Sequence, residues 1–128
     1  MGKMTVLDSS AFLTMINGEK GADKVTERLP WALISAVNQA EVHTKLVSTG
    51  MEEQVAWWHI DQINCESVPF DEKQARQTGA LVSVTKPFGL SLGDRACLAL
   101  AIERKASVYT TDRVWKNLNL GIEIEVIR

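Results

Sequence analysis

Short runs of apolar residues recur along the chain, and each one ends in polar or turn-forming residues. This is the pattern of buried strands. The first run ends abruptly in Asp8, which is followed by two serines. In the last run, Glu123 and Glu125 alternate with apolar residues, which is typical of an edge strand with one solvated face. We therefore predict strands at residues 4–7, 31–35, 65–70, 107–110 and 122–127.

Between these runs, apolar residues recur at three- and four-residue spacing, which is typical of helices that pack one face on a core. Asn17-Gly18 and Thr49-Gly50 are stop signals. The segment 92–103 is apolar nearly all round, so we expect a central, covered helix. The segment 85–91 contains Pro and Gly and is expected to be a ligand-facing loop. We predict helices at residues 8–17, 22–28, 35–48, 51–63, 71–84 and 92–103, with a short helical turn around Trp115.

Alternation of strands and helices indicates an α/β fold, with a parallel sheet covered by helices on both faces. A chain of 128 residues is an ordinary length for one domain, residues 1–128, and can form a core without a disulfide or metal staple. In such sheets, ligands bind outside the carboxyl ends of the strands. Asp8 follows the first predicted strand, so it is expected at the edge where the chemistry takes place.

Composition narrows the class of protein. The formal net charge of −2 argues against a non-specific nucleic-acid coat, but it allows a nuclease with a local basic rim. Cys65 and Cys97 lack metal-ligand spacing, and Cys97 lies in an apolar helical run, so we predict a buried free thiol there. Because the chain shows neither a signal-peptide pattern nor an apolar run of membrane-spanning length, we expect a cytoplasmic protein with no membrane partner.

Three carboxylates occupy the same kind of position, next to a predicted helix start: Asp8, Asp94 and Asp112. Asp8 and Asp112 follow predicted strands. Each also has a purely structural explanation. Asp is a preferred helix N-cap, and Ser91 with Asp94 has the spacing of a capping box.

Glu41 differs, because helix capping cannot explain a carboxylate in the middle of the predicted helix 35–48. A buried and unpaired carboxylate is costly, so it needs a cation, a basic partner or a proton. A salt bridge to Lys45, four residues later, is the structural alternative. The helical spacing places Glu41 on a mainly apolar face with Val37, Ala40, Thr44 and Val47.

If these four carboxylates converge at one edge of the sheet, they repel one another and raise one another's pKa values. Such a cluster is reasonable around a hard cation, and oxygen ligands favour Mg²⁺ or Mn²⁺. A bound ion of this kind activates water and stabilises charge on a phosphate.

Four segments in order resemble the PIN domain family, and within it the VapC toxins of bacterial and archaeal toxin–antitoxin pairs. They are VLDSSAFL with Asp8, SAVNQAEVHTKL with Glu41, LSLGDRACLALA with Asp94, and VYTTDRVW with Asp112. The resemblance covers essentially the whole chain. It implies a PIN-like α/β/α sandwich with a central parallel sheet of four to five strands, and Mg²⁺-dependent (or Mn²⁺-dependent) endoribonuclease activity. It also implies a cognate antitoxin, often one that pushes an arginine or lysine into the acidic site.

The resemblance further implies a role for each acid. Asp8 and Asp94 would be the principal metal ligands, and Asp112 would bind the ion directly or through water. Asp112 is also the position at which family members vary most. Glu41 would complete the cluster and help to position or deprotonate the attacking water. The hydroxyl of Thr110 would support the cluster.

Four cations are expected near the same edge, where they could meet RNA phosphates. Ordinary solvated surface charge is the alternative explanation for each. They are Lys86, Arg95, Arg113 and Lys116.

We interpret the chain as a ribonuclease toxin that cuts structured RNA, such as tRNA or rRNA, and has a VapB-like antitoxin as a separate chain. A toxin homodimer is expected, because the Trp57-Trp58 helix and the first helices offer apolar surface beyond one core. Two alternatives stay open. One is a PIN-fold structure-specific nuclease of RNA processing or DNA repair without an antitoxin, and the other is a non-catalytic α/β binding module. A receiver-like module would have paired acids after the first strand, whereas serines follow Asp8, and Ser10 likewise argues against a DxD phosphatase.

Overall fold

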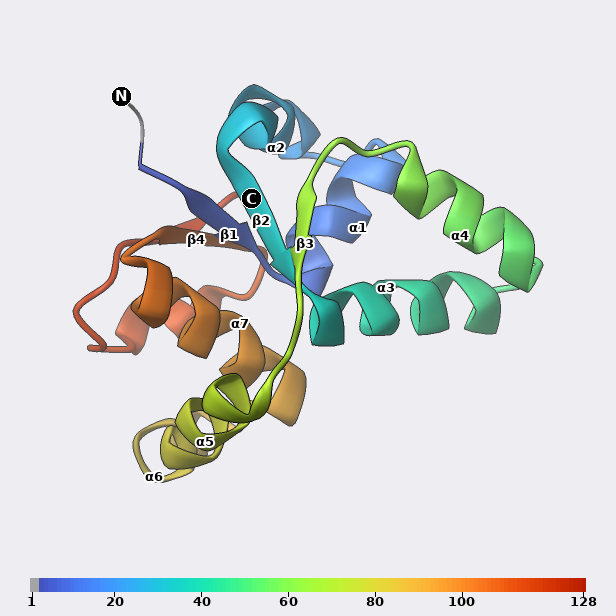
Figure 1. Ribbon diagram of the computed structural model, residues 1–128. Coiled ribbons are helices and arrows are strands. Elements are labelled where there is room, and N and C mark those ends of the chain that lie inside the picture. Colours follow the sequence, from blue (N-terminus) through green and yellow to red (C-terminus); the bar gives the residue numbers. More distant parts are fainter. Residues whose placement is uncertain (1–2) are drawn as a thin grey trace.

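The computed structural model describes residues 3–128. Within these residues, five strands form one sheet in the order β3-β2-β1-β4-β5, and every neighbouring pair is parallel (Figure 1). The predicted parallel sheet and the edge position of the last strand are therefore confirmed. The strands are β1 (Thr5–Leu7), β2 (Ala32–Ser35), β3 (Glu66–Val68), β4 (Ser107–Thr110) and β5 (Ile124–Val126).

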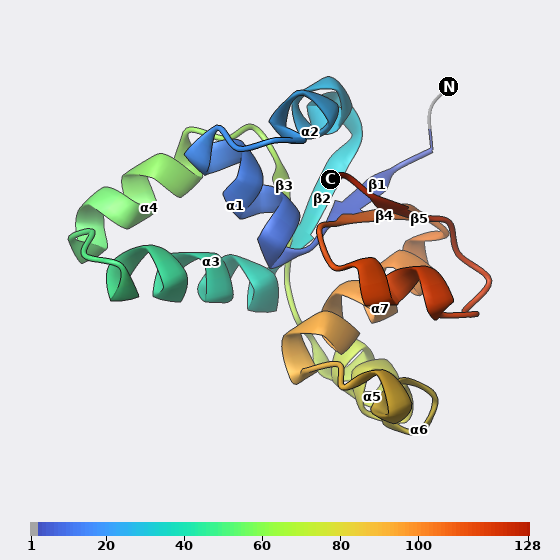
Figure 2. The same ribbon diagram turned by 180° about the vertical axis from the view of Figure 1, so that it is seen from behind.

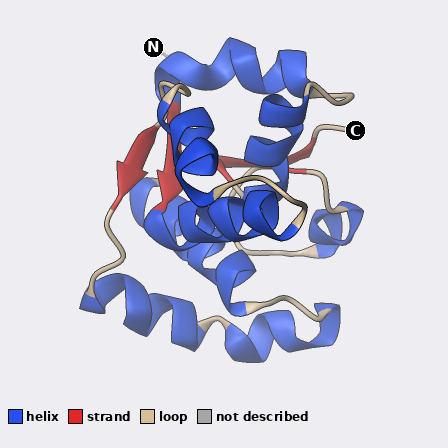
Figure 3. Cartoon of the chain, turned by 90° about the vertical axis from the view of Figure 1, so that its right-hand side faces the viewer, coloured by secondary structure: helices blue, strands red, loops and turns tan. Residues whose placement is uncertain are grey.

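Helices cover both faces of the sheet, which confirms the α/β/α arrangement (Figures 2 and 3). The first four helices pack on one face, and α5 and α7 pack together on the other. The α-helices are α1 (Ser9–Asn17), α2 (Ala22–Arg28), α3 (Ala36–Ser48), α4 (Glu53–Asp61), α5 (Glu72–Ala80), α6 (Val82–Thr85) and α7 (Leu92–Arg104). The 3₁₀ helices are η1 (Leu29–Trp31), η2 (Lys86–Phe88) and η3 (Arg113–Asn117).

One predicted helix is divided in the structure. The segment 71–84 forms α5 and then the short α6, because the backbone ψ angle of Leu81 is −8° and interrupts the regular helix. The predicted loop 85–91 likewise contains the short helix η2, which ends at Gly89 in the left-handed conformation (φ 68°).

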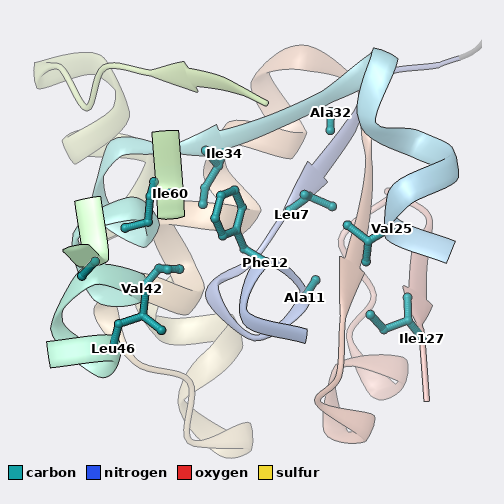
Figure 4. Packing of buried hydrophobic residues seen from close by; sticks show 11 residues of the cluster. Leu7, Ala11, Phe12, Val25, Ala32, Ile34, Val42, Leu46, Ile60 and Ile127 are labelled. Atoms are coloured by element: carbon teal, nitrogen blue, oxygen red, sulfur yellow. The ribbon is translucent and has the colours of Figure 1, made fainter. Parts of the chain in front are cut away.

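The pleat of the central strands divides the apolar residues between two cores. Leu7 and Ile34 face the helices α1 to α4, where they pack with Phe12 (Figure 4). Their neighbours Val6 and Leu33 face the opposite way, toward α7. The expectation of a covered, central α7 is confirmed, because seven of its residues are buried. These two cores fix the ends of β1, β2 and β4 relative to the start of α7.

The predicted packing face of α3 is wrong. Asn38, Val42 and Leu46 are the buried residues of this helix, whereas Val47 is 37% exposed. The core therefore takes the positions i, i+4 and i+8 from Asn38, and the face that contains Glu41 is turned outward. Asn38 can be buried because its side-chain amide donates hydrogen bonds to Glu41 and to the carbonyl oxygen of Gly93.

The two adjacent tryptophans of α4 point in different directions. Trp57 packs against the core and stacks on the His43 ring, with a centroid separation of 4.2 Å, whereas Trp58 is 58% exposed. Cys97 is a buried free thiol, as predicted. Across residues 3–128, the longest apolar helices are too short or too polar to cross a membrane.

Candidate active site

The four predicted carboxylates line one open cavity of about 300 Å³. Two of them follow the carboxyl ends of adjacent strands, Asp8 after β1 and Asp112 after β4. Glu41 comes from the second turn of α3, and Asp94 comes from the first turn of α7. Segments far apart in sequence are thus brought together by the parallel topology, at the edge where open α/β sheets bind ligands. The other lining residues are Ser9, Ser10, Leu13 and Lys45.

Asp8 is the most buried of the four, at 4% exposure. It is the N-cap of α1, and its Oδ1 accepts hydrogen bonds from the backbone N–H of Ala11 (2.8 Å) and from the Ser10 hydroxyl (2.7 Å). Its Oδ2 accepts a hydrogen bond of 2.5 Å from the Thr110 hydroxyl. The capping explanation of Asp8 is therefore correct, but a capping carboxylate does not need three donors or burial beside other acids.

Burial raises the pKa of Asp8 from its ordinary value of 3.8 to about 6. Loss of hydration is the largest cause, and the hydrogen bonds from Thr110, Ser10 and Ala11 oppose it. The nearby charge of Asp94 raises the pKa further. Asp8 is thus a carboxylate whose ionised form lacks a compensating positive charge.

Glu41 is held by donors from two helices. Its Oε1 accepts hydrogen bonds from the Ser9 hydroxyl (2.5 Å) and from the Asn38 amide (2.9 Å). The salt bridge to Lys45 that was the structural alternative is not formed, within residues 3–128, at the usual 4 Å limit. Both donors fix the carboxylate toward the cavity, so Glu41 has a positioned orientation that simple surface charge does not require.

Gly93 gives Glu41 the space for this position. A methyl group added at Gly93 would overlap the Glu41 carboxylate. The same amide of Asn38 that binds Glu41 also donates to the Gly93 carbonyl oxygen, at 3.0 Å. The start of α7 therefore contacts Glu41 closely, and this contact sets how near Asp94 lies to the other acids.

Asp94 forms the predicted capping box with Ser91. Its Oδ2 accepts from the Ser91 N–H at 2.9 Å, and its own N–H donates to the Ser91 hydroxyl at 3.2 Å. Partial burial raises the pKa of Asp94, the bonds from Ser91 lower it, and the charges of Glu41 and Asp112 raise it. Capping uses one carboxylate oxygen, and the acidic neighbours show that Asp94 also belongs to the cluster.

Asp112 is the exposed member of the cluster and the N-cap of η3. Its Oδ1 accepts from the Val114 N–H at 3.0 Å. Its own N–H donates to the Thr110 hydroxyl at 3.1 Å, and this hydroxyl in turn donates to Asp8. Thr110 thus joins the two carboxylates that follow β1 and β4.

The atoms in this cavity that could ligate a metal ion are carboxylate oxygens, together with the hydroxyl oxygens of Ser9 and Ser10. Oxygen-only sets of this kind suit Mg²⁺ or Mn²⁺. Among residues 3–128, no three His, Cys, Asp or Glu side chains are already close enough to hold an ion between them. Burial is the largest cause of the raised pKa values of Asp8 and Asp94, and the charges of their acidic neighbours raise these pKa values further. A bound cation would offset both effects.

The four predicted basic residues do not line this cavity. The Nη1 of Arg95 donates to the Thr78 carbonyl oxygen at 3.0 Å, which ties α7 to α5. Lys86 lies in η2, while Arg113 and Lys116 lie in η3 and line a separate cavity.

The basic residue that does line the acidic cavity is Lys45, which the sequence suggested only as a salt-bridge partner. Its position four residues after Glu41 on one helix face was the available signal. Ser9, Ser10 and Asn38 were also missed as site residues. The two serines were detectable, because they begin the helix that Asp8 caps. The role of Asn38 depends on a contact across 55 residues of sequence.

The model of the PIN domain family matches residues 5–119. The chain belongs to the PIN domain family. Solved structures agree with this fold. VapBC2 from Rickettsia felis, bound to a promoter DNA fragment, superposes with a TM-score of 0.75 at 20% identity and covers 95% of this chain and 97% of its own. DNA-bound VapBC from Salmonella typhimurium gives 0.75 at 18% identity, covering 97% and 98%.

VapC20 from Mycobacterium tuberculosis, described as a Sarcin-Ricin loop cleaving toxin, gives a TM-score of 0.76 at 12% identity. It covers 93% of this PIN domain chain and 98% of its own. A search of curated protein sequences finds no match.

Proposed function

We propose that this PIN domain protein is a divalent-metal-dependent endoribonuclease and the toxin of a VapBC-type toxin–antitoxin pair. The observation that carries the proposal is the convergence of Asp8, Glu41, Asp94 and Asp112 on one cavity of a PIN fold. A structural explanation accounts for single acids as helix caps, but it does not account for four in one place.

Asp8, Asp94 and Asp112 would hold Mg²⁺ or Mn²⁺, with water completing the oxygen ligands. When bound, such an ion supplies positive charge to a phosphate in transit and lowers the pKa of bound water. Asp8 is fixed for this task from both sides, by the Ala11 and Ser10 donors at one oxygen and by Thr110 at the other. The rigid donors keep the carboxylate in place against repulsion by Asp94.

Glu41 would orient the attacking water and accept its proton. Its Oε1 is occupied by Ser9 and Asn38. Within residues 3–128, its Oε2 receives no side-chain hydrogen bond, so this oxygen is available to a water in the cavity. Glu41 is therefore both positioned and open to solvent, as a general base must be.

Lys45 would bind the substrate phosphate at the rim of the cavity. It lies one helical turn after Glu41, on the exposed side of α3, and it contributes the cation among the lining residues. A lysine ammonium attracts a phosphate oxygen without fixing its orientation. Lys45 would thus bring a polyanion toward an acidic cluster that otherwise repels it.

RNA is the proposed substrate, and structured RNA such as tRNA or rRNA is the proposed class. VapC20, which shares the fold, is described as cleaving the Sarcin-Ricin loop. The partner would be a VapB-like antitoxin, since solved structures with this fold include VapBC from Salmonella typhimurium and a toxin–antitoxin complex from Klebsiella pneumoniae. The exposed side of α4, with Trp58 and Val55, offers apolar surface for a second chain, either the antitoxin or another copy of the toxin.

The experiment is cleavage of purified tRNA and rRNA by the isolated protein with Mg²⁺, with Mn²⁺ and with EDTA. Asp8→Asn and Asp94→Asn should each abolish discrete, metal-dependent cuts. Asp71→Asn is the matched control, because Asp71 caps α5 through a 2.9 Å bond to the Gln74 N–H and lies outside the cavity. Calorimetric titration with Mn²⁺ gives a second readout, in which only the cavity variants should lose binding.

Intact RNA with either metal would contradict the nuclease proposal, and so would cleavage by both cavity variants at the rate of the parent. The toxin proposal has a separate test. A short neighbouring reading frame, co-expressed with the chain, should form a complex with it and relieve growth arrest. A nuclease that is active without such a partner would favour RNA processing or DNA repair.

A further inference from the structure

A second open cavity, of about 680 Å³, lies beside the end of β5. The chain has 14 lysines and arginines, and five of them line this cavity, whereas Asp23 is the acid in the lining. The net charge of the chain is −2, so this local excess of positive charge departs from the rest of the molecule. The five cations are Lys20, Lys24, Arg113, Lys116 and Arg128.

The cavity is built by a close backbone approach between the α1–α2 connection and the end of β5. Gly21 has φ of +100°, and a Cβ atom there would lie 2.6 Å from the carbonyl oxygen of Ile127. Glycine therefore allows the connection to pack on the strand end. This contact holds the lysines of the connection and of α2 around the same cavity as the cations of η3.

Exposed acids neutralise only part of this charge. Lys24 pairs with Glu125 at 3.7 Å, and Arg128 pairs with Glu19 at 3.2 Å. Both pairs are half exposed, so they contribute little and can exchange partners. In the described chain, residues 3–128, the ion pairs leave Lys20, Arg113 and Lys116 without an acidic partner.

The basic cavity adjoins the acidic one along the same edge of the sheet. Thr110 of β4 pairs with Val126 of β5, so the residues that follow these strands emerge side by side. Asp112 lines the acidic cavity, and the next residue, Arg113, lines the basic one. An RNA backbone that extends from the acidic cavity past η3 would therefore come directly into contact with the cations of the basic cavity.

We propose that this basic cavity binds the sugar–phosphate backbone of the RNA on one side of the scissile phosphate, an inference that rests on the proposed ribonuclease function. The lining residues within 3–128 include no aromatic side chain on which a base could stack. Lysine and arginine contacts to phosphates fix the position of a nucleic acid and carry no base information. The cavity thus adds affinity that does not depend on base sequence.

The test uses Lys20→Gln/Lys116→Gln in the Asp8→Asn chain, so that RNA is bound but not cut. Binding of two fluorescein-labelled RNA hairpins of unrelated sequence, each with a single-stranded extension, is measured between 50 and 300 mM KCl, roughly the range over which phosphate contacts are lost. The slope of log K against log[KCl] is negative, and each lost phosphate contact reduces its magnitude by about 0.7. The slope of the double variant should therefore be less steep by about 1.4. Affinity should fall several-fold, by the same factor for both hairpins.

The matched control is Lys73→Gln/Arg104→Gln, which removes the same charge at the opposite edge of the sheet. Arg104 ends α7, just before β4 begins, and Lys73 contacts Glu103 in the same region. An equal loss of affinity in this control, or no change in slope for the cavity variant, would overturn the proposal. Circular dichroism melting checks that each variant is folded.

The outcome is separable from that of the proposed function. If the parent chain cuts RNA and the cavity variant binds RNA as tightly as the Asp8→Asn chain, the proposed role of the basic cavity is wrong and the nuclease proposal stands. If the cavity variant loses salt-dependent RNA binding but the parent chain cuts no RNA, RNA binding by the basic cavity is supported and the nuclease proposal is wrong.

Discussion

The hydroxyl of Thr110 donates a 2.5 Å hydrogen bond to Oδ2 of Asp8, across 102 residues of sequence. The same hydroxyl accepts the N–H of Asp112 at 3.1 Å, so one side chain orients two acids of the cavity. We predict that Thr110→Val raises the pKa of Asp8 above about 6, because the bond from Thr110 lowers it. Mn²⁺ affinity and RNA cleavage at pH 7 should fall about 10- to 100-fold.

Thr110→Ser is the matched control, since it keeps the hydroxyl and removes only a methyl group. This variant should retain most of the activity. The pH profile distinguishes an electrostatic role from loss of packing, because the Val variant should recover part of its activity at higher pH. A pH-independent loss, or equal losses in both variants, would assign Thr110 to packing alone.

Asp8 also makes the stability of the protein depend on pH. Its pKa is about 6 in the folded chain and near 3.8 when unfolded, so the folded state binds the proton more tightly. The contribution of Asp8 to the free energy of unfolding is therefore greatest at low pH, and this contribution is lost as pH rises from about 4 to about 6. The pKa difference corresponds to about 3 kcal/mol. Asp8→Asn should thus raise the melting temperature at pH 7 in EDTA and bring little gain at pH 4.

The comparison needs a carboxylate that caps a helix without lying in the cluster. Asp71 has this geometry at the start of α5, and Asp71→Asn should leave the melting temperature at pH 7 nearly unchanged. Mn²⁺ should stabilise the parent more than the Asp8→Asn variant, so that with Mn²⁺ the parent has the higher melting temperature. A parent chain that is more stable than the Asn variant in EDTA at pH 7 would contradict the assigned burial effect.

Two helical glycines separate backbone effects from site effects. An added methyl at Gly93 overlaps the Glu41 carboxylate, whereas at Gly79 in α5 it meets no atom within 4 Å. Gly93→Ala should move Glu41 away from Ser9 and Asn38 and lower RNA cleavage at least tenfold, since small displacements at a site are costly. Gly79→Ala should stabilise the chain by up to about 1 kcal/mol and leave cleavage unchanged. Equal activity in both variants would show that the position of Glu41 is not critical.

Much of the fold could be predicted from the sequence because its signals are local. The apolar runs before Asp8 and after Ser107 end at polar residues, so the strand ends and the acids that follow them were identifiable together. Parallel topology then brings those ends to one edge without further information. The PIN-type order of Asp8, Glu41, Asp94 and Asp112 added the two acids that come from helices.

The parts that were missed depend on contacts between distant segments. Val37 is only partly buried and Val47 is exposed, so the apolar pattern of α3 alone predicted the wrong packing face. The core accepts Asn38 because Gly93 supplies an acceptor 55 residues later, and no local pattern encodes such a partner. The hydrogen bond from Arg95 to the Thr78 carbonyl oxygen on α5 is another contact between distant segments, and Arg95 does not line the acidic cavity.

Lys45 allows a test of how the acidic cavity tolerates a polyanionic substrate. It lines the cavity beside Glu41 without forming an ion pair within residues 3–128. Lys45→Gln should raise the KM for RNA several-fold with a smaller effect on kcat, because a phosphate contact at the rim acts on binding more than on the reacting atoms. Lys45→Arg should restore the KM, since it keeps the charge. Kinetics with a labelled RNA hairpin decide the matter: a fall in kcat with unchanged KM would instead place Lys45 at the scissile phosphate.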